Sequence, residues 1–309
     1  MMTNVKNNLP VCYDEISDLP ASATAAAIGN FDGVHPGHRA VFGRMREVAE
    51  ERNLRALAVT FRGNPKFSCA VKGHLLPEPQ QREALSRAGV ETVLRLDFER
   101  YRGYAPETFV REVLLGALHC DVVLVGENFR FGKDRAGDTE LLGSVLAEAG
   151  KELIVLPSVR FEGETLSSTA VREALMAGEI GRASALLGRP VCYLLPVESG
   201  ARIGRTLGFP TANQKLPEKL VLPRFGVYAS EAEVGDGEIY PAVSNVGVKP
   251  TVGSAYPLIE THLLGFSGEL TGKTIRVTLK KFLRAEMRFD SIYELRNQIA
   301  MDIENAGKV

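Results

Sequence analysis

Between residues 25 and 156 the chain alternates short β-prone runs with longer stretches of helical character. The β-prone runs cover residues 25–28, 56–60, 92–96, 122–126 and 153–156, and the helical stretches cover 37–52, 78–88, 106–118 and 139–149. Strand, helix, strand at this spacing predicts βαβ units and a Rossmann-like parallel sheet. In such sheets a ligand binds beyond the carboxyl ends of the strands, so segments that follow strands are candidates for a site.

The pattern changes after two more helical segments, 168–178 and 183–187. From about Arg189 the β-prone runs 191–197, 226–233, 240–246, 258–264 and 274–282 are broken by Gly and Pro. This pattern predicts an antiparallel β-barrel or sandwich. A last helix is expected over 291–305, with Ser291 as N-cap and Glu294 in capping-box position. We expect an α/β domain over 1–186 and an all-β domain with a closing helix over 187–309.

Bulk properties exclude several classes. The formal net charge is −1, which argues against a protein that coats nucleic acid, and no run reaches the roughly 18 apolar residues of a membrane span. The N-terminus lacks an apolar stretch of signal-peptide type. The four cysteines are far apart without CxxC spacing, so zinc and a disulfide framework are not expected. We expect a cytoplasmic protein without nucleic-acid or membrane partners; the sequence does not set its oligomeric state.

The junction of the first strand and helix, AIGNFDGVHPGHRAVF, carries His35 and His38 around Pro36 and Gly37. One interpretation is a tight turn that opens a helix with exposed histidines. Another is an anion site, because Gly37 lets a phosphate approach the backbone and two imidazoles can donate to developing charge. Metal ligation is a third interpretation, weakened because no cysteine or carboxylate joins the pair at ligand spacing.

Two later segments favour the anion site. VGENFRFGKDRAGD, after the fourth strand, carries Asn128 among cationic and aromatic residues, although a charged surface loop would look similar. LSSTAVREAL, after the fifth strand, offers hydroxyls that could simply cap a helix but also suit a triphosphate, with an arginine one turn further on. The residues concerned are Ser167, Ser168, Thr169 and Arg172.

Together the three segments resemble the FMN adenylyltransferase branch of the HxGH nucleotidyltransferase superfamily. The resemblance implies that His35 and His38 are catalytic and that ATP is held by Gly29, Phe31, Gly37, Asn128, Ser167, Ser168, Thr169 and Arg172. Transfer of AMP to FMN needs no general base, because the attacking phosphate oxygen is already ionised; the site must position two polyanions and stabilise charge. TFRGNP, residues 60–65, departs from the family pattern at Arg62 and Gly63 but keeps Asn64, which we expect to contact flavin.

The second half opens with ESGARIGRTLGFPTAN, residues 198–213, which is not a Walker A loop. On composition alone it could be a glycine-rich barrel loop with a proline turn. With AVSNVGVKPT, ETHLLGF and LRAEMRF it is similar to the riboflavin kinase signature. From about Ala25 to Ala306 the chain thus resembles the bifunctional riboflavin kinase/FMN adenylyltransferases (FAD synthetases) of bacteria.

That resemblance implies riboflavin, FMN and ATP as substrates and Mg²⁺ as cofactor. Thr211 and Asn213 would hold Mg²⁺ and the ATP phosphates, as hard oxygen ligands suit. Glu260 would be the general base that a hydroxyl nucleophile needs, and it shares one strand face with His262. Arg284 is expected to contact flavin, and Gly265 replaces a frequent Asp. Gly200, Arg205 and Gly208 complete the expected phosphate-binding set.

Two alternatives remain beside a bifunctional enzyme. One is an enzyme with a single activity, most plausibly because the change at Arg62 and Gly63 weakens the N-terminal site. The other is a flavin- or nucleotide-binding regulator without chemistry, which would have no need of Glu260.

Overall fold

The computed structural model describes residues 9–63, 73–199, 208–235, 237–251 and 254–309. By its internal contacts the chain divides into two compact units. The first unit comprises Met1–Ala70 and Gln81–Ser167, and the second comprises Val71–Gln80 and Ser168–Val309. Each unit is described by itself below.

The first unit is built on a six-stranded parallel sheet with strand order β1-β4-β3-β2-β5-β6. The five predicted strands are present, which confirms the parallel α/β fold. A short edge strand that the sequence pattern did not predict, β1, precedes them. Its three residues are too few to show an alternation of apolar and polar residues. The strands are β1 Val11–Tyr13, β2 Thr24–Ile28, β3 Arg55–Arg62, β4 Thr92–Asp97, β5 Cys120–Gly126 and β6 Glu152–Leu156.

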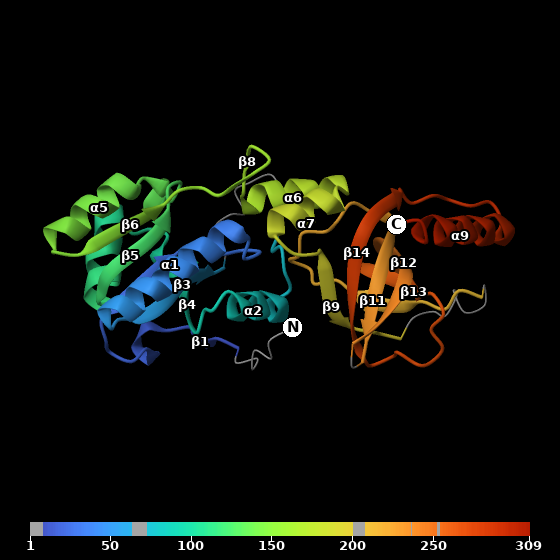
Figure 1. Ribbon diagram of the computed structural model, residues 1–309, viewed down its shortest axis with the longest axis horizontal. Helices are drawn as coiled ribbons and strands as arrows, with labels where there is room; N and C mark the ends of the chain where they lie inside the picture. Colours follow the sequence, from blue (N-terminus) through green and yellow to red (C-terminus); the bar gives the residue numbers. More distant parts are fainter. Residues whose placement is uncertain (1–8, 64–72, 200–207, 236, 252–253) are drawn as a thin grey trace. The chain divides into compact units, whose positions relative to one another are not determined.

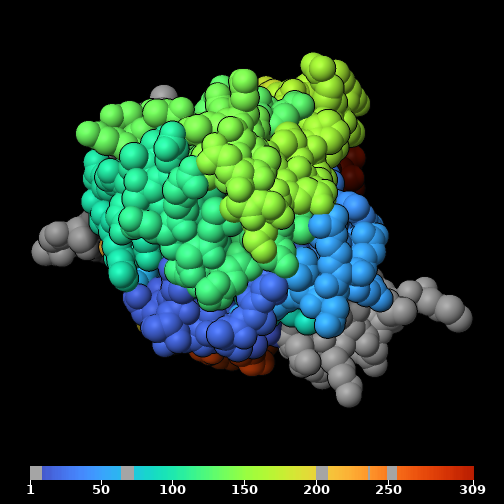
Figure 2. All heavy atoms as spheres, turned by 90° about the vertical axis from the view of Figure 1, so that its left-hand side faces the viewer, coloured from blue at the N-terminus to red at the C-terminus, as the bar shows by residue number. Residues whose placement is uncertain are grey.

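Helices cover both faces of this sheet (Figure 1). The helical elements are α1 Pro36–Arg52, α2 Glu78–Arg87, α3 Phe98–Tyr101, α4 Pro106–Thr108, a π-helix Phe109–Ala117 and α5 Thr139–Glu148, with 3₁₀ turns Ile16–Asp18 and Lys133–Arg135. A hairpin of β7 Arg160–Phe161 and β8 Glu164–Thr165 follows β6. Figure 2 shows the surface of this unit, with green and blue segments packed against one another.

Strand β2 shows how the sheet separates two cores. Ala26 and Ile28 pack with the π-helix and α5, whereas Ala25 and Ala27 pack with α1. Successive side chains of a strand point to opposite faces, so a strand covered on both faces must be apolar throughout. All five residues of β2 are buried, which explains the short uninterrupted apolar run in the sequence.

The second unit contains a six-stranded antiparallel barrel, as predicted, with strand order β10-β13-β12-β11-β14-β9. Between the two end strands the described residues form one backbone bridge, just after β9, in which Glu198 N donates to Asn213 O at 2.8 Å. The barrel is therefore nearly closed. Its strands are β9 Cys192–Pro196, β10 Ala212–Lys215, β11 Gly226–Val234, β12 Glu238–Thr251, β13 Ser254–Leu263 and β14 Thr274–Arg284.

In the described part of the second unit, the barrel is accompanied by the helices α6 Ser168–Ala177, α7 Ile180–Leu187 and α9 Ile292–Ala306. Ser291 caps α9, since its Oγ accepts from Glu294 N at 3.2 Å, which confirms the predicted cap. Glu294 Oε2 in turn accepts from Asp290 N at 3.2 Å, one residue before the position of a standard capping box. In the described part of the chain, no helix combines the length and apolarity needed to cross a bilayer.

Two candidate active sites

The first candidate site lies where β2 ends and α1 begins. His35 is the N-cap residue of α1 and Pro36 its first residue, so the first-turn N–H groups of a 17-residue helix open at this point. Between strand and helix, Phe31 and Val34 adopt positive φ angles of 44° and 43°, which are rare for such residues. Strained backbone of this kind persists where the surrounding structure fixes it, often at functional sites.

The two histidines form one stacked unit. The ring centroids of His35 and His38 are 3.6 Å apart with an interplanar angle of 23°, and the Phe31 and His38 rings form a T-shaped pair with centroids 5.3 Å apart. His35 is only 6% exposed, so the interpretation of two solvent-exposed histidines does not describe it. The two imidazoles thus lie together at the start of α1, and their catalytic role stays a prediction.

Two of the three glycines of this junction leave space that aromatic rings occupy. A Cβ at Gly29 would lie 2.9 Å from the Phe31 ring, and a Cβ at Gly37 would lie 3.1 Å from the His35 ring. Gly37 was predicted to allow a phosphate to approach the backbone; the structure gives it the additional task of seating His35.

Side chains from two other elements hold the strained turn. Gln81 of α2 donates from Nε2 to Phe31 O at 2.7 Å, and its Oε1 accepts from Gly33 N at 3.3 Å. Thr60, near the end of β3, donates to Asn30 O at 3.2 Å. Each bond fixes a backbone group that no strand or helix satisfies. Sequence reasoning missed Gln81, because a glutamine on an amphipathic helix carries no local signal.

The second predicted segment follows β5, the neighbour of β2 in the sheet. Its Asn128 therefore follows a strand end on the same edge as the histidine junction, and its Nδ2 donates to Ser158 Oγ at 3.1 Å. Within the loop, Phe129 and Phe131 stack at 5.5 Å, which keeps these aromatic residues out of water. A role of Asn128 in ATP binding stays a prediction.

The third predicted segment spans the division between the units. Ser167 ends the first unit, and Ser168, Thr169 and Arg172 lie in the first turns of α6 in the second. Arg172 is 2% exposed, and its Nε and Nη2 donate to Gly73 O at 3.4 and 3.2 Å. Contact of these residues with phosphate stays a prediction.

The departure from the family pattern after β3 has a structural counterpart. Arg62 pairs with Glu15 at 3.1 Å, beside a two-bond pair between Arg95 and Asp14 at 2.8 and 2.9 Å. Arg62 is thus engaged with the acidic segment that follows β1. Asn64, the expected flavin contact, lies outside the described residues.

The second candidate site is a row of polar residues across the barrel. Asn213 of β10 is in register with Glu260 of β13, and Glu260 is in register with Asn245 of β12. Directly opposed residues point to the same face of a sheet. Their chain neighbours Gln214, Thr261 and Ser244 are fully buried in the barrel interior, so the row lies on the outer face.

Asn213 is equipped to bind a cation. Its Oδ1 is buried and accepts no hydrogen bond from the described residues, while its Nδ2 donates to Thr211 O at 3.4 Å. A buried acceptor without a donor is destabilising unless another partner binds it, and amide and hydroxyl oxygens are ligands of Mg²⁺. The residues present therefore fit the predicted metal.

A histidine fixes the turn that leads to Asn213. His262 shares the face of Glu260, and its Nδ1 lies 2.8 Å from Pro210 O. Since a carbonyl only accepts, Nδ1 carries the proton. The Phe209 and His262 rings also form a T-shaped pair, with centroids 5.5 Å apart. Gly208 has a φ of 87° and open space around it, whereas Gly200 and Arg205 lie outside the described residues.

Arg284, the other predicted flavin contact, is held by the closing helix. Its Nε and Nη2 donate to the two oxygens of Asp302 at 2.9 and 2.7 Å, and Asp302 is 3% exposed. Arg284 also lies 5.9 Å from the Phe289 ring centroid. Arg284 lies at the end of β14 and is in register with Val227 of β11, which is in turn in register with Asn245 of β12. Flavin contact stays a prediction.

Sequence reasoning missed Asn245, Gln214 and Asp302. Asn245 lies in the quoted segment AVSNVGVKPT, but only strand register shows that it flanks Glu260. Gln214 and Asp302 had no signal, because a lone glutamine or aspartate usually lies on a surface.

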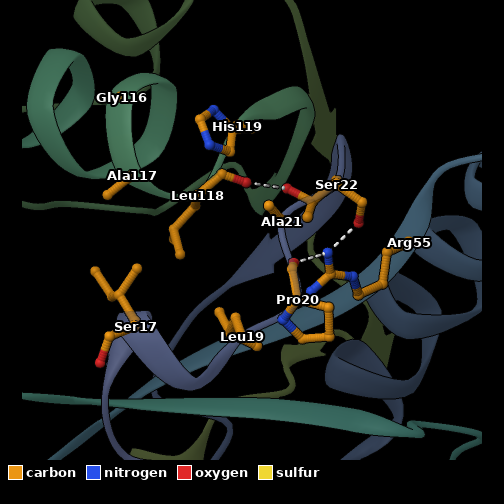
Figure 3. A pocket seen from close by; sticks show the side chains of 12 residues that line it. Ser17, Leu19, Pro20, Ala21, Ser22, Arg55, Gly116, Ala117, Leu118 and His119 are labelled. Carbon is orange, nitrogen blue, oxygen red and sulfur yellow. Dashed lines mark hydrogen bonds between the residues drawn. The ribbon is translucent and has the colours of Figure 1, made fainter.

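A separate pocket of about 270 Å³ lies at the opposite edge of the first unit's sheet, where β2, β3 and β5 begin. Arg55 donates there to Pro20 O and Ser22 Oγ, and His119 stands across the pocket (Figure 3). None of the predicted site residues lines it. Because ligands of parallel α/β sheets bind at the carboxyl ends, this pocket is not the candidate active site.

Comparisons with known proteins agree with this division of sites. A family model described as FAD synthetase matches residues 19–170, and one described as Riboflavin kinase matches 187–309. A bifunctional riboflavin kinase/FMN adenylyltransferase of Escherichia coli (strain K12) is 37% identical over 292 residues, covering 93% of both chains. That of Bacillus subtilis (strain 168) is 33% identical, covering 91% of this chain and 90% of the other.

A solved structure shares the fold over nearly the whole length. The crystal structure titled as a macrolide-efflux protein from Streptococcus pneumoniae has a TM-score of 0.83 and 27% identity, covering 97% of this chain and 99% of that one. The two family models and the extent of the curated relatives agree with the motifs on both units. The chain therefore belongs to the family of bifunctional riboflavin kinase/FMN adenylyltransferases.

Proposed function

We propose that the two sites act in sequence on one flavin. The domain over 187–309 transfers the terminal phosphate of ATP to the 5′-hydroxyl of riboflavin and forms FMN. The domain over 1–186 then transfers AMP from a second ATP to the FMN phosphate and releases pyrophosphate, forming FAD. The observation that carries the proposal is the row Asn213–Glu260–Asn245, in which a carboxylate lies beside a buried amide oxygen that accepts no hydrogen bond from the described residues.

In the kinase site Glu260 takes the proton from the riboflavin hydroxyl as the oxygen attacks phosphorus. A base is needed because an alcohol holds its proton about as firmly as water, whose pKa is about 15.7. Thr211 and Asn213 hold Mg²⁺, which when bound neutralises charge on the ATP phosphates. His262 keeps the Pro210 carbonyl in place, so that Thr211 and Asn213 arrive at the edge of the barrel in one orientation.

In the adenylyltransferase site the helix start and the imidazole pair stabilise charge. The phosphate of FMN attacks the α-phosphorus of ATP, and negative charge grows on the α-phosphate and the leaving pyrophosphate. His35 and His38 donate to these oxygens, supported by the first-turn N–H groups of α1. In the first unit, Asn128 and Ser167 are the predicted contacts of the remaining ATP phosphates, and phosphate contact by Ser168, Thr169 and Arg172 of the second unit stays a prediction.

The test is product analysis of the two half-reactions. Wild-type protein with riboflavin, ATP and Mg²⁺ should yield FMN and then FAD, separated by chromatography. Glu260→Gln should lower kcat for FMN formation by about 10²–10⁴-fold with riboflavin affinity unchanged, and should leave FAD formation from supplied FMN intact. His38→Ala should show the reverse pattern.

Three results would contradict the proposal. Wild-type protein that binds flavin without forming FMN would support the regulator interpretation, and FMN without FAD would support a single activity. A Glu260→Gln variant within about threefold of wild type in kcat would remove Glu260 from the role of base.

A further inference from the structure

The barrel interior contains a long polar side chain that the kinase chemistry does not use. Gln214 of β10 is 0% exposed and points into the barrel interior, on the face opposite to Asn213. Its Oε1 is buried and accepts no hydrogen bond from the described residues. A buried acceptor without a donor is destabilising, so the burial of a glutamine at this position needs another explanation.

The donors of Gln214 bridge the open seam of the barrel. Nε2 donates to Leu195 O of β9 at 2.7 Å and to Ile275 O of β14 at 3.0 Å. Leu195 and Ile275 face each other in the β9–β14 ladder. The Gln214 amide of β10 thus donates to both residues of one cross-strand pair of β9 and β14, across the gap between β10 and β9.

These two hydrogen bonds matter because the described part of β10 makes few others toward β9. The strand has four residues and pairs along its length with β13. Toward β9, the described part of the backbone contributes one bridge, from Glu198 N to Asn213 O. Among the described residues, this bridge and the Gln214 side chain are therefore the hydrogen bonds that set the position of Asn213 relative to β9.

We propose that Gln214 is a positioning residue for the metal site: by tying β10 to β9 and β14 it holds the Oδ1 of Asn213 where a divalent cation with a nucleotide phosphate can bind. The proposal rests on the proposed role of Asn213 in the kinase site. Gln214 touches neither metal nor substrate and acts through the neighbouring residue. Outer partners that orient ligands typically change metal affinity by about 10–100-fold when removed.

The test compares Gln214→Met with Ser230→Ala in the full-length protein. Methionine has a similar length and lacks both the amide donors and the orphaned acceptor. Ser230 is a buried barrel residue whose Oγ lies 2.8 Å from Ser244 Oγ, and it makes no bond to β10 in the described structure. Both variants remove polar groups from the same interior, but only one loosens β10.

Binding of ADP with Mg²⁺ is measured by calorimetry, with melting temperature recorded beside it. Gln214→Met should bind Mg·ADP about tenfold more weakly and should also melt earlier than wild type, because it removes the two hydrogen bonds to backbone carbonyls. The Mg²⁺ concentration for half-maximal FMN formation should rise by a similar factor, with kcat recovered at high Mg²⁺ and the KM for riboflavin unchanged. Ser230→Ala should melt earlier and bind Mg·ADP as wild type does.

The outcomes distinguish a failure of the positioning role of Gln214 from a failure of the proposed metal-binding role of Asn213. If Asn213→Ala leaves Mg·ADP affinity unchanged, the metal site itself is misplaced and both proposals are overturned. If Asn213→Ala weakens binding but Gln214→Met stays within twofold of wild type, only the positioning role is overturned. Should Gln214→Met fail to fold, Gln214→Asn keeps the amide on a shorter side chain that cannot reach both carbonyls. Wild-type affinity in that variant would equally overturn the role.

Discussion

The buried ion pair between β14 and the closing helix gives a sharp test of what fastens α9 to the barrel. Arg284 donates two hydrogen bonds to Asp302, at 2.9 and 2.7 Å, and Gln298 Nε2 adds a third at 3.0 Å. The side chains of Arg284 and Asp302 are only 19% and 5% exposed. In Asp302→Ala the guanidinium loses its partner while it stays largely buried.

The expected loss follows from that geometry. Breaking a buried ion pair by removing one partner costs about 3–5 kcal/mol, because the remaining charge stays desolvated. Taking about 3 kcal/mol for this partly exposed pair, the opening equilibrium of α9 should rise by somewhat more than 10²-fold. The assay is hydrogen–deuterium exchange of peptides covering 292–306, followed by mass spectrometry, since the chain has no tryptophan to report fluorescence.

The control lies on the same helix. Glu304 pairs with Lys308 at 2.9 Å, but both side chains are well exposed, at 72% and 64%. Exposed pairs of this kind contribute little to stability, so Glu304→Gln should leave exchange in α9 unchanged. A double variant, Asp302→Leu with Arg284→Met, should recover protection, because an apolar pair has no stranded charge. Equal protection in Asp302→Ala and wild type would refute the reasoning.

Two further predictions concern the first unit. Gly37→Ala should lower the rate of FAD formation several-fold, because the new Cβ displaces the His35 ring. Gly43→Ala is the control on the same helix: its new Cβ has no described atom within 4 Å, so it should keep the activity and raise helix stability by up to about 1 kcal/mol. Equal rates of FAD formation in the two variants would contradict the role of Gly37. Burial raises the pKa of the Cys120 thiol to about 12, so in the native protein at pH 8 iodoacetamide should alkylate it after Cys12 and Cys192, as mass spectrometry of tryptic peptides would show. Because this folded pKa is raised, the thiol's contribution to stability is complete below about pH 8.5 and is lost as the pH rises toward 12. Alkylation of Cys120 as fast as Cys12 would count against its burial.

Much of the fold was predictable because it rests on local periodicity. A strand covered on both faces reads as a short apolar run, as β2 does, and the antiparallel strands of the barrel are separated by Gly and Pro. The start of α9 was predictable because Ser291 has a side-chain hydroxyl that can cap a helix. Short strands were not predicted. β1 has three residues and β10 has four, which are too few to show an alternation of apolar and polar residues, and each is stabilised by pairing with a longer strand.

By itself the sequence determined which residues carry the candidate chemistry, since His35, His38, Asn213 and Glu260 lie in contiguous motifs. Only the tertiary structure decided which residues stand beside them. Register across three strands brought Asn245 next to Glu260, and the nearly closed barrel carried Gln214 to carbonyls of two other strands. The physical reason is that cross-strand and cross-seam neighbours are set by backbone pairing between segments far apart in the chain, for which no single segment holds a signal.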